Sequence, residues 1–236
     1  MITDFHSHIL PGIDDGSDSV EKSIEMLKME AAQGIRHVVA TPHFYPNHDS
    51  PERFLARRDR AEAALREAMK DHEGLPELTV GAEVYFFPGI SDCDAIKALT
   101  IGESRCILLE MPEYSWSDSA YQQIERIYAK QGLTPLIAHV DRYISPLRDR
   151  GIPKRLAQLP VAVQANASFF LHGSTARMAL KMLSKGQIHV LGSDCHNLSS
   201  RKPNLSDALS CIQRRLGEEW VETIRKHEAR LLGVNK

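Results

Sequence analysis

Short apolar runs rich in β-branched residues alternate along the chain with longer segments of helical periodicity. Seven of these runs have the length and composition of strands, and they cover residues 2–8, 37–43, 78–86, 106–112, 134–140, 161–167 and 188–194. Helical patterns cover residues 19–34, 50–74, 206–215 and 218–232. Because parallel strands need crossover connections, strands separated by helices indicate a parallel sheet. The sequence therefore predicts an α/β fold, built either as a closed barrel or as an open doubly wound sheet.

The boundaries of two helices carry clear signals. Gly34 follows an apolar pattern that includes Ile24 and Leu27, and a glycine at that place ends a helix. Ser50 and Pro51 open the longest helical segment, as an N-cap followed by a residue suited to the first turn. The chain has no G-x-G-x-x-G and no G-x-x-x-x-G-K-[ST] motif, so nucleotide binding through such loops is not expected. It also has no internal repeat or linker, and we expect one domain over residues 1–236.

Charge and cysteine content narrow the classes of function. The 29 lysines and arginines nearly equal the 31 aspartates and glutamates, so nucleic-acid binding through bulk charge is not expected. The chain has no apolar run of about 18 residues and begins without the basic start and apolar core of a signal peptide. The four cysteines form no C-x-x-C pair and are expected to be free thiols: Cys93, Cys106, Cys195 and Cys211. We therefore expect a cytoplasmic protein that does not insert into a membrane.

Side chains that can bind metal ions stand at or near the end of nearly every predicted strand. They are His6, His8, Asp14, Asp15, His43, Glu83, Glu110, His139, Asp194 and His196. The carboxyl ends of parallel strands meet at one edge of a sheet, where the active sites of such folds lie, so these side chains are expected to converge. His6 and His8 are two positions apart, as are Asp194 and His196, and such pairs point to the same face of a strand.

The mixture of donors indicates the kind of metal and the kind of reaction. Glu83 and Glu110 lie inside apolar runs, where a carboxylate is rarely buried without a partner. Imidazole and carboxylate donors without a thiolate suit Mn, Fe, Zn or Mg. The donors are too numerous for one ion, so we expect two or three divalent ions. Neighbouring divalent ions are a common device for hydrolysing phosphate esters.

Six separated motifs resemble those of the polymerase-and-histidinol-phosphatase (PHP) superfamily. They are "DFHSHILPGIDDG", "ATPHF", "GAEVYF", "LLEMP", "AHVDRY" and "GSDCHN". They look most like the motifs of the bacterial manganese-dependent protein-tyrosine phosphatases of capsule and exopolysaccharide synthesis. The resemblance implies a distorted, TIM-like seven-stranded (β/α) barrel with a trinuclear site, preferably of Mn, at the carboxyl ends of the strands. The ligands that it implies are His6, His8, Asp15, His43, Glu83, Glu110, His139, Asp194 and His196.

The fifth motif departs from the family pattern. The family commonly has His-Pro-Glu-Arg, whereas this chain has His139-Val140-Asp141-Arg142. By resemblance, Arg142 would hold the substrate phosphate. We also expect Asp141, its neighbour, to assist Arg142 or the leaving group. The implied reaction is hydrolysis of phosphotyrosine in a protein, with the tyrosine-rich tail of a bacterial tyrosine kinase that controls polysaccharide export as the expected substrate.

Aromatic residues that follow the ligand motifs are predicted to form an exposed rim for the phosphotyrosine ring. They are Tyr45, Phe86, Phe87, Tyr114 and Trp116.

Three other interpretations remain open. In the first, the chain is a different PHP phosphoesterase, acting on histidinol phosphate or nucleic-acid ends. In the second, it is a metal-binding regulator without turnover. In the third, the thiolate of Cys195 attacks phosphorus and Arg201 holds the phosphate, because their spacing is that of the cysteine-dependent phosphatases. The loop between these two residues lacks the glycines that turn backbone amides toward a phosphate. Cys195 also stands between Asp194 and His196, and if those two face metal ions, its thiol points away from them.

Overall fold

The structure is a computed structural model, and it describes residues 2–113, 116–144 and 151–233. Within these residues every strand pairing is parallel, and the strands form two sheets. The smaller sheet contains, in order, β1 (Thr3–Ser7), β2 (His37–Ala40) and β4 (Glu77–Val80). The larger sheet contains β3 (His43–Phe44), β5 (Glu83–Tyr85), β6 (Cys106–Glu110), β7 (Thr134–Ile137), β8 (Ala162–Asn166) and β9 (Val190–Gly192). The predicted parallel α/β fold is confirmed.

Two of the predicted strands are interrupted. The run 37–43 appears as β2 and β3, and the run 78–86 appears as β4 and β5. Pro42 has no N–H to donate to a ladder, which accounts for the first break. Main-chain bonds still cross both breaks, since Gly81 N donates to Ala40 O at 2.8 Å and Glu83 N donates to Pro42 O at 3.0 Å.

The last strand also reaches the first. Asp194 N donates to the carbonyl of His6 at 2.8 Å, and His8 N donates to the carbonyl of Cys195 at 2.9 Å. These bonds bring the end of β9 against the end of β1, although the two strands belong to different sheets. Closure into one seven-stranded barrel remains a prediction.

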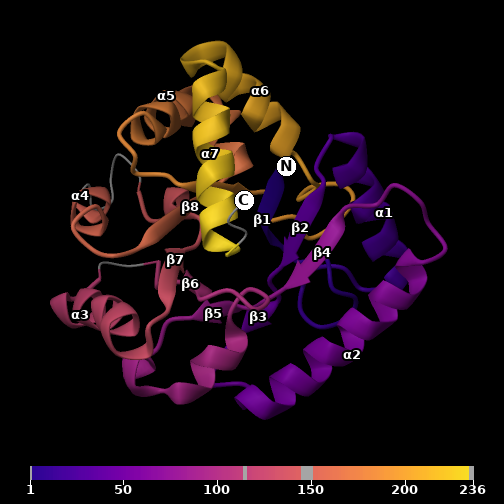
Figure 1. Cartoon of the computed structure of the whole chain (residues 1–236), viewed down its shortest axis with the longest axis horizontal. Coiled ribbons are helices and arrows are strands. Elements are labelled where there is room, and N and C mark those ends of the chain that lie inside the picture. The colour runs from indigo at the N-terminus through magenta and orange to yellow at the C-terminus, as the bar shows by residue number, and fades with distance from the viewer. Residues whose placement is uncertain (1, 114–115, 145–150, 234–236) are drawn as a thin grey trace.

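Helices surround the strands (Figure 1). They are α1 (Val20–Ala32), α2 (Pro51–Met69), α3 (Asp118–Arg126), α4 (Ile152–Leu156), α5 (Gly173–Leu183), α6 (Leu205–Leu216) and α7 (Glu218–Leu231). Short 3₁₀ or π segments cover η1 (Ile90–Asp92), η2 (Asp94–Leu99), η3 (Ile127–Gln131), η4 (Val140–Arg142) and η5 (Ala167–Phe170). The predicted N-cap of α2 is confirmed, because the Ser50 hydroxyl accepts from Arg53 N at 3.3 Å. No segment of the described chain is a helix long and apolar enough to cross a membrane.

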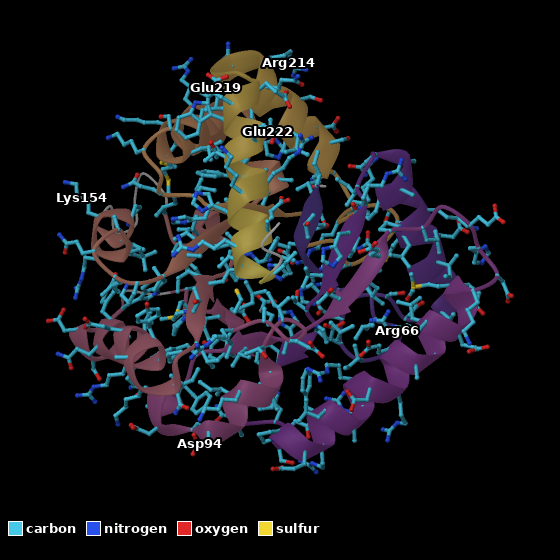
Figure 2. All side chains as sticks on the ribbon, viewed as in Figure 1. Arg66, Asp94, Lys154, Arg214, Glu219 and Glu222 are labelled. Atoms are coloured by element: carbon cyan, nitrogen blue, oxygen red, sulfur yellow. The ribbon has the colours of Figure 1, made fainter. Side chains whose placement is uncertain are left out.

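The buried core consists of two clusters of apolar side chains. The smaller cluster is made mostly of strand residues, among them Phe5, Val39 and Leu108, which are fully buried. The larger cluster packs the helices onto the sheets, as Ile24 and Leu27 do from α1. Charged side chains project outward around the fold (Figure 2). Helix α7 packs against β1 and β9 and reaches the start of β1, so the carboxyl ends of the strands lie at the opposite end, where the site forms.

Glu228 on α7 is buried against the start of β1. Its Oε2 accepts from Thr3 N at 3.2 Å, and only 2% of the residue is exposed. Burial raises the pKa of this carboxyl from 4.5 to about 8, and the bonds with Thr3 oppose that rise. The folded chain therefore holds a proton at Glu228 that the unfolded chain releases at lower pH.

We expect Glu228→Gln to be more stable than the unmodified chain at pH 9 by roughly 1–3 kcal/mol, and nearly equal to it at pH 4.5. The folded pKa lies above the unfolded pKa, so the free energy of unfolding falls as the pH rises from about 4.5 to about 8. The glutamine oxygen still accepts from Thr3, but it cannot ionise. Urea unfolding across this pH range measures the effect, with exposed Glu73→Gln as the control. A stability difference that does not change with pH would contradict the prediction.

Candidate metal centre

The structure brings all nine implied ligands to the carboxyl ends of the strands. Three sets of donor atoms lie within 4.8 Å of one another, namely His8–Asp15–His43–His196, His6–His8–Asp194 and His43–Glu83–Glu110. His139 joins the third set, because its Nε2 lies 2.7 Å from Glu83 Oε1. His8 and His43 each belong to two sets, so neighbouring sets share donors. Their role as ligands remains a prediction, but the arrangement is that of one connected cluster.

Glu83 Oε2 lies at the centre of this cluster, close to three imidazole nitrogens. It lies 3.1 Å from His6 Nε2, 3.2 Å from His8 Nε2 and 3.1 Å from His43 Nδ1. It has no hydrogen bond of acceptable geometry within the described residues, and neither does His43 Nδ1. Atoms that bind the same ion at about 2.0–2.2 Å lie roughly 3 Å apart, so these spacings fit a shared metal ion better than they fit hydrogen bonds.

The protonation of the cluster also suits metal binding. Burial lowers the pKa of both His43 and His196 to about 4, which leaves each imidazole neutral with a lone pair to donate. Burial alone would lower the pKa of His8, but Asp14 and Glu83 outweigh it and raise that pKa to about 10. Burial, together with the charge of Glu83, raises the pKa of Glu110 to about 7. Without cations, then, the carboxylates draw protons into the site, and divalent ions can replace those protons.

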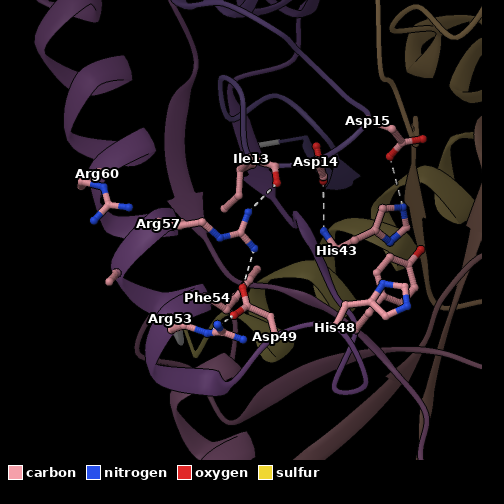
Figure 3. A pocket seen from close by; sticks show the side chains of 12 residues that line it. Ile13, Asp14, Asp15, His43, His48, Asp49, Arg53, Phe54, Arg57 and Arg60 are labelled. Atoms are coloured by element: carbon pink, nitrogen blue, oxygen red, sulfur yellow. Dashed lines mark hydrogen bonds and ion pairs between the residues drawn. The ribbon is translucent and has the colours of Figure 1, made fainter.

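A second layer of side chains orients the imidazoles. Asp14 Oδ2 accepts from His8 Nδ1 at 2.8 Å and from His43 N at 3.0 Å, which leaves His8 Nε2 facing the cluster. Gln164 Oε1 lies 3.2 Å from His6 Nδ1 and accepts from His139 N at 2.5 Å. Carboxylate and amide partners of this kind fix the orientation and tautomer of metal-binding histidines. The two aspartates therefore differ: Asp14 supports His8, whereas Asp15 faces His43 and His196 at 3.6 and 3.5 Å. Figure 3 shows Asp15 beside the His43 ring.

The backbone is strained where it carries two of these side chains. His139 has φ of 27° and Asp194 has φ of 53°, and within the described chain they are the non-glycine residues with positive φ. Such conformations cost about 1–3 kcal/mol each and gather at functional sites. Glycine is needed at Gly192, because an added Cβ would lie 2.5 Å from the Cβ of His6. The strands at this end are thus held closer than ordinary side chains allow.

Comparisons with known proteins identify the family. Residues 2–232 match the family model described as "Capsular polysaccharide synthesis, CpsB/CapC". The chain belongs to this family. It is 28% identical over 229 residues to tyrosine-protein phosphatase CpsB of Streptococcus agalactiae serotype III, covering 92% of this chain and 91% of that one. It is 30% identical over 226 residues to tyrosine-protein phosphatase YwqE of Bacillus subtilis, covering 92% and 85% of the two chains.

Solved structures support the same fold. A crystal structure from work on YwqE of B. subtilis and CpsB of Streptococcus pneumoniae, described as unique metal-dependent tyrosine phosphatases, matches with a TM-score of 0.84. The match has 24% identity and covers 100% of this chain and 96% of the other. A mutant organophosphorus hydrolase matches with a TM-score of 0.57 and 16% identity over 98% and 92% of the two chains. The fold of this chain is therefore shared with the metal-dependent tyrosine phosphatase structure and, with a lower TM-score, with the organophosphorus hydrolase.

Two arginines face the cluster in this member of the CpsB/CapC family. Arg142 Nη2 donates to Asp194 Oδ2 at 2.5 Å, and Arg201 Nη2 donates to Asp194 Oδ1 at 2.9 Å. The side chain of each is about one-third exposed, at 34% and 38%. Sequence reasoning assigned Arg142 to the phosphate, but it gave Arg201 a role only in the cysteine-phosphatase interpretation. The sequence places Arg201 five residues after His196, just beyond the last motif, which could have drawn attention to it. Only the fold turns the loop after His196 back onto Asp194.

Asp141 is hydrogen-bonded to the end of strand β8, next to the cluster. Its Oδ1 accepts from Asn166 N at 2.9 Å, and Asn166 Nδ2 in turn donates to Asp194 Oδ2 at 3.0 Å. Through these bonds Asp141 positions the end of β8 beside Asp194. Direct help to Arg142 or to the leaving group remains a prediction.

The predicted aromatic rim is only partly present. Phe86 and Trp116 are 8% and 7% exposed, so the expectation that they line the opening is wrong. Trp116 packs edge-on against Tyr143 and donates from Nε1 to Pro112 O at 3.0 Å, which holds it in the core. Tyr45 does line the opening and stacks on His43 with ring centroids 5.0 Å apart. Phe87 is half-buried beside a neighbouring hollow, and Tyr114 lies outside the described residues.

Cys195 is fully buried on the side away from the histidines. Its thiol lies within 4.8 Å of carboxylate atoms of Asp4 and Glu30, and burial raises its pKa well above the usual value of 9.0. The predicted alternation of Asp194, Cys195 and His196 therefore holds. A buried neutral thiol is a poor nucleophile.

We expect Cys195→Ser to keep kcat/KM for p-nitrophenyl phosphate within about threefold, because the thiol faces the core and carries no charge. Iodoacetamide should leave the rate unchanged for the same reason. His196→Ala, the adjacent substitution, should lose most of this activity and serves as the contrasting variant. Loss of activity in Cys195→Ser, in a variant that still folds by circular dichroism, would restore the thiolate mechanism.

Proposed function

We propose that this chain is a metal-dependent phosphatase that hydrolyses phosphotyrosine in proteins. The observation that carries the proposal is the cluster of shared imidazole and carboxylate donors that opens between two arginines. Relatives of nearly the same length, 28–30% identical, are tyrosine-protein phosphatases, and they support the choice of substrate. Two or three divalent ions, Mn first and Fe, Zn or Mg as alternatives, suit a site without a thiolate ligand.

Bound ions would supply an activated water and neutralise charge on the phosphate oxygens. The nine side chains named above would hold them, with Asp14 and Gln164 keeping His8 and His6 in place. Arg142 and Arg201 would give up their hydrogen bonds to Asp194 and bind the phosphate oxygens instead. A guanidinium can bind two such oxygens at once. Tyr45, stacked on His43, would form a wall for the phenyl ring. The leaving group is a phenolate with a pKa of about 10, so strong acid assistance is not required.

We further propose how the two sheets close, which protein is the substrate and where in the cell the protein acts. The main-chain bonds across the breaks and between β9 and β1 support one distorted seven-stranded barrel in a single domain over residues 1–236. The capsule-synthesis family supports a bacterial tyrosine kinase that controls polysaccharide export as the protein substrate, met in the cytoplasm.

Chelation is expected to lower turnover of a phosphotyrosine peptide and of p-nitrophenyl phosphate by more than about a hundredfold, and Mn²⁺ should restore it. Rates on histidinol phosphate and single-stranded DNA, measured in parallel, separate the other phosphoesterase activities. Dominance of either of these substrates would overturn the choice of phosphotyrosine. Failure to turn over any substrate with Mn²⁺ present would favour the metal-binding regulator, and turnover that survives chelation would overturn the metal mechanism.

A further inference from the structure

A groove of about 750 Å³ runs from the candidate metal centre along helix α2. One wall is formed by the loop that carries Asp14 and Asp15 and by strand β3 with the loop after it, which carry His43 and Tyr45. The other wall is formed by one face of α2. Figure 3 shows this arrangement, with the arginines of α2 across the groove from Asp15 and His43. A peptide whose phosphotyrosine enters the centre therefore meets the surface of α2 with its neighbouring residues.

The wall on α2 carries an excess of positive charge. Arg53, Arg57 and Arg60 are spaced four and three residues apart, which places them on the same face of the helix. Asp49 pairs with two of them, at 3.1 Å from Arg53 Nε and 2.7 Å from Arg57 Nη2. One carboxylate balances one guanidinium, so this wall keeps two uncompensated charges.

Arg60 differs from the other arginines of α2. Arg57 also donates to Ile13 O at 3.0 Å, and Arg66 pairs with Glu62 and donates to Leu78 O at 2.9 Å, so both stabilise the fold. Arg58 donates to the carbonyls of Gly81 and Ala98. Arg60 is exposed and has no carboxylate within 4.0 Å among the residues that the structure describes. Its guanidinium is the one on this helix available for an anion that comes from outside.

We propose that Arg60, backed by Arg53, binds a second anionic side chain of the phosphotyrosine substrate and so selects acidic peptides. The inference rests on the phosphotyrosine activity proposed above and adds which phosphotyrosine sites are preferred. A guanidinium recognises both a carboxylate and a phosphate, so the anion is an Asp or Glu near the phosphotyrosine or a second phosphotyrosine. Asp49 holds Arg53 in place before a peptide arrives, which reduces the entropy lost on binding.

The test compares three peptides that each contain one phosphotyrosine. They differ only in the kind of residue that stands two to four positions before and after it. One peptide carries Glu, one carries non-hydrolysable phosphonomethyl-phenylalanine and one carries Ala. With Mn²⁺ and about 50 mM salt, we expect kcat/KM of at least one anionic peptide to exceed that of the Ala peptide about tenfold, mostly through KM. The preferred anionic peptide identifies the anion.

Arg60→Glu should reduce the ratio of anionic to Ala peptide to about one or below, because it reverses the charge in the groove. Arg214→Glu makes the same change on an exposed arginine of α6, away from α2 (Figure 2), and should keep the wild-type ratio. Equal kcat/KM for all three peptides, or a preference that survives Arg60→Glu, overturns the groove assignment while leaving the proposed function standing. No hydrolysis of any peptide by the wild type removes the proposed function, and this inference with it.

Discussion

His8→Ala is expected to reduce kcat/KM for a phosphotyrosine peptide by on the order of a thousandfold, the largest effect of any single substitution in the site. His8 belongs to two of the three donor sets, and its Nε2 lies 3.1 Å from His6 Nε2 and 3.2 Å from Glu83 Oε2. Its removal therefore opens two proposed metal positions at once. It also leaves the Asp14 side chain, which is only 6% exposed, without its imidazole partner.

Metal content distinguishes loss of ligation from misfolding in this variant. We expect fewer Mn²⁺ ions per chain by elemental analysis, with a far-UV circular dichroism spectrum like that of the wild type. His172→Ala, an exposed histidine at the start of α5, should retain both metal and activity. Full metal occupancy in His8→Ala, or activity within tenfold of wild type, would remove His8 from the set of ligands.

Arg142→Ala is expected to lower kcat by about one hundredfold to one thousandfold and to leave metal content unchanged. The Arg142 side chain is 34% exposed at the opening of the cluster, and its Nη2 contacts Asp194 Oδ2 at 2.5 Å. A phosphate that enters between Arg142 and Arg201 would take the place of that carboxylate. The guanidinium then meets the charge that builds on the phosphate oxygens as the ester bond breaks.

Arg142→Lys keeps the charge but loses the planar fork, and we expect it to recover only part of the rate. Arg214→Ala, remote and exposed, should match the wild type. Steady-state kinetics on p-nitrophenyl phosphate measures all three variants. Equal kcat in Arg142→Ala and wild type would mean that Arg142 serves only to hold Asp194. An Arg142→Lys variant as active as wild type would mean that the positive charge suffices and the planar fork is not needed.

Much of the fold was predictable because its signals are local. Apolar runs reveal buried parallel strands, and the N-cap at Ser50 and the glycine at Gly34 lie within a turn of the helix ends that they mark. Helices α3, α4 and α5 were not predicted, and α4 is only five residues long. The exposed aromatic rim was wrong for Phe86 and Trp116, because exposure depends on what packs against a loop, as Tyr143 does against Trp116.

The sequence by itself determined which donors are present and that they gather at one end, because strand ends and the two-residue alternation of side chains follow from local chain geometry. That reasoning separated Cys195 from its neighbours before any contact was known. Only the tertiary structure decided that Asp14 orients His8 while Asp15 faces the cluster, and that Arg201 returns to Asp194. Those assignments depend on distances of about 3 Å between segments far apart in the chain, which side-chain directions within one strand do not determine.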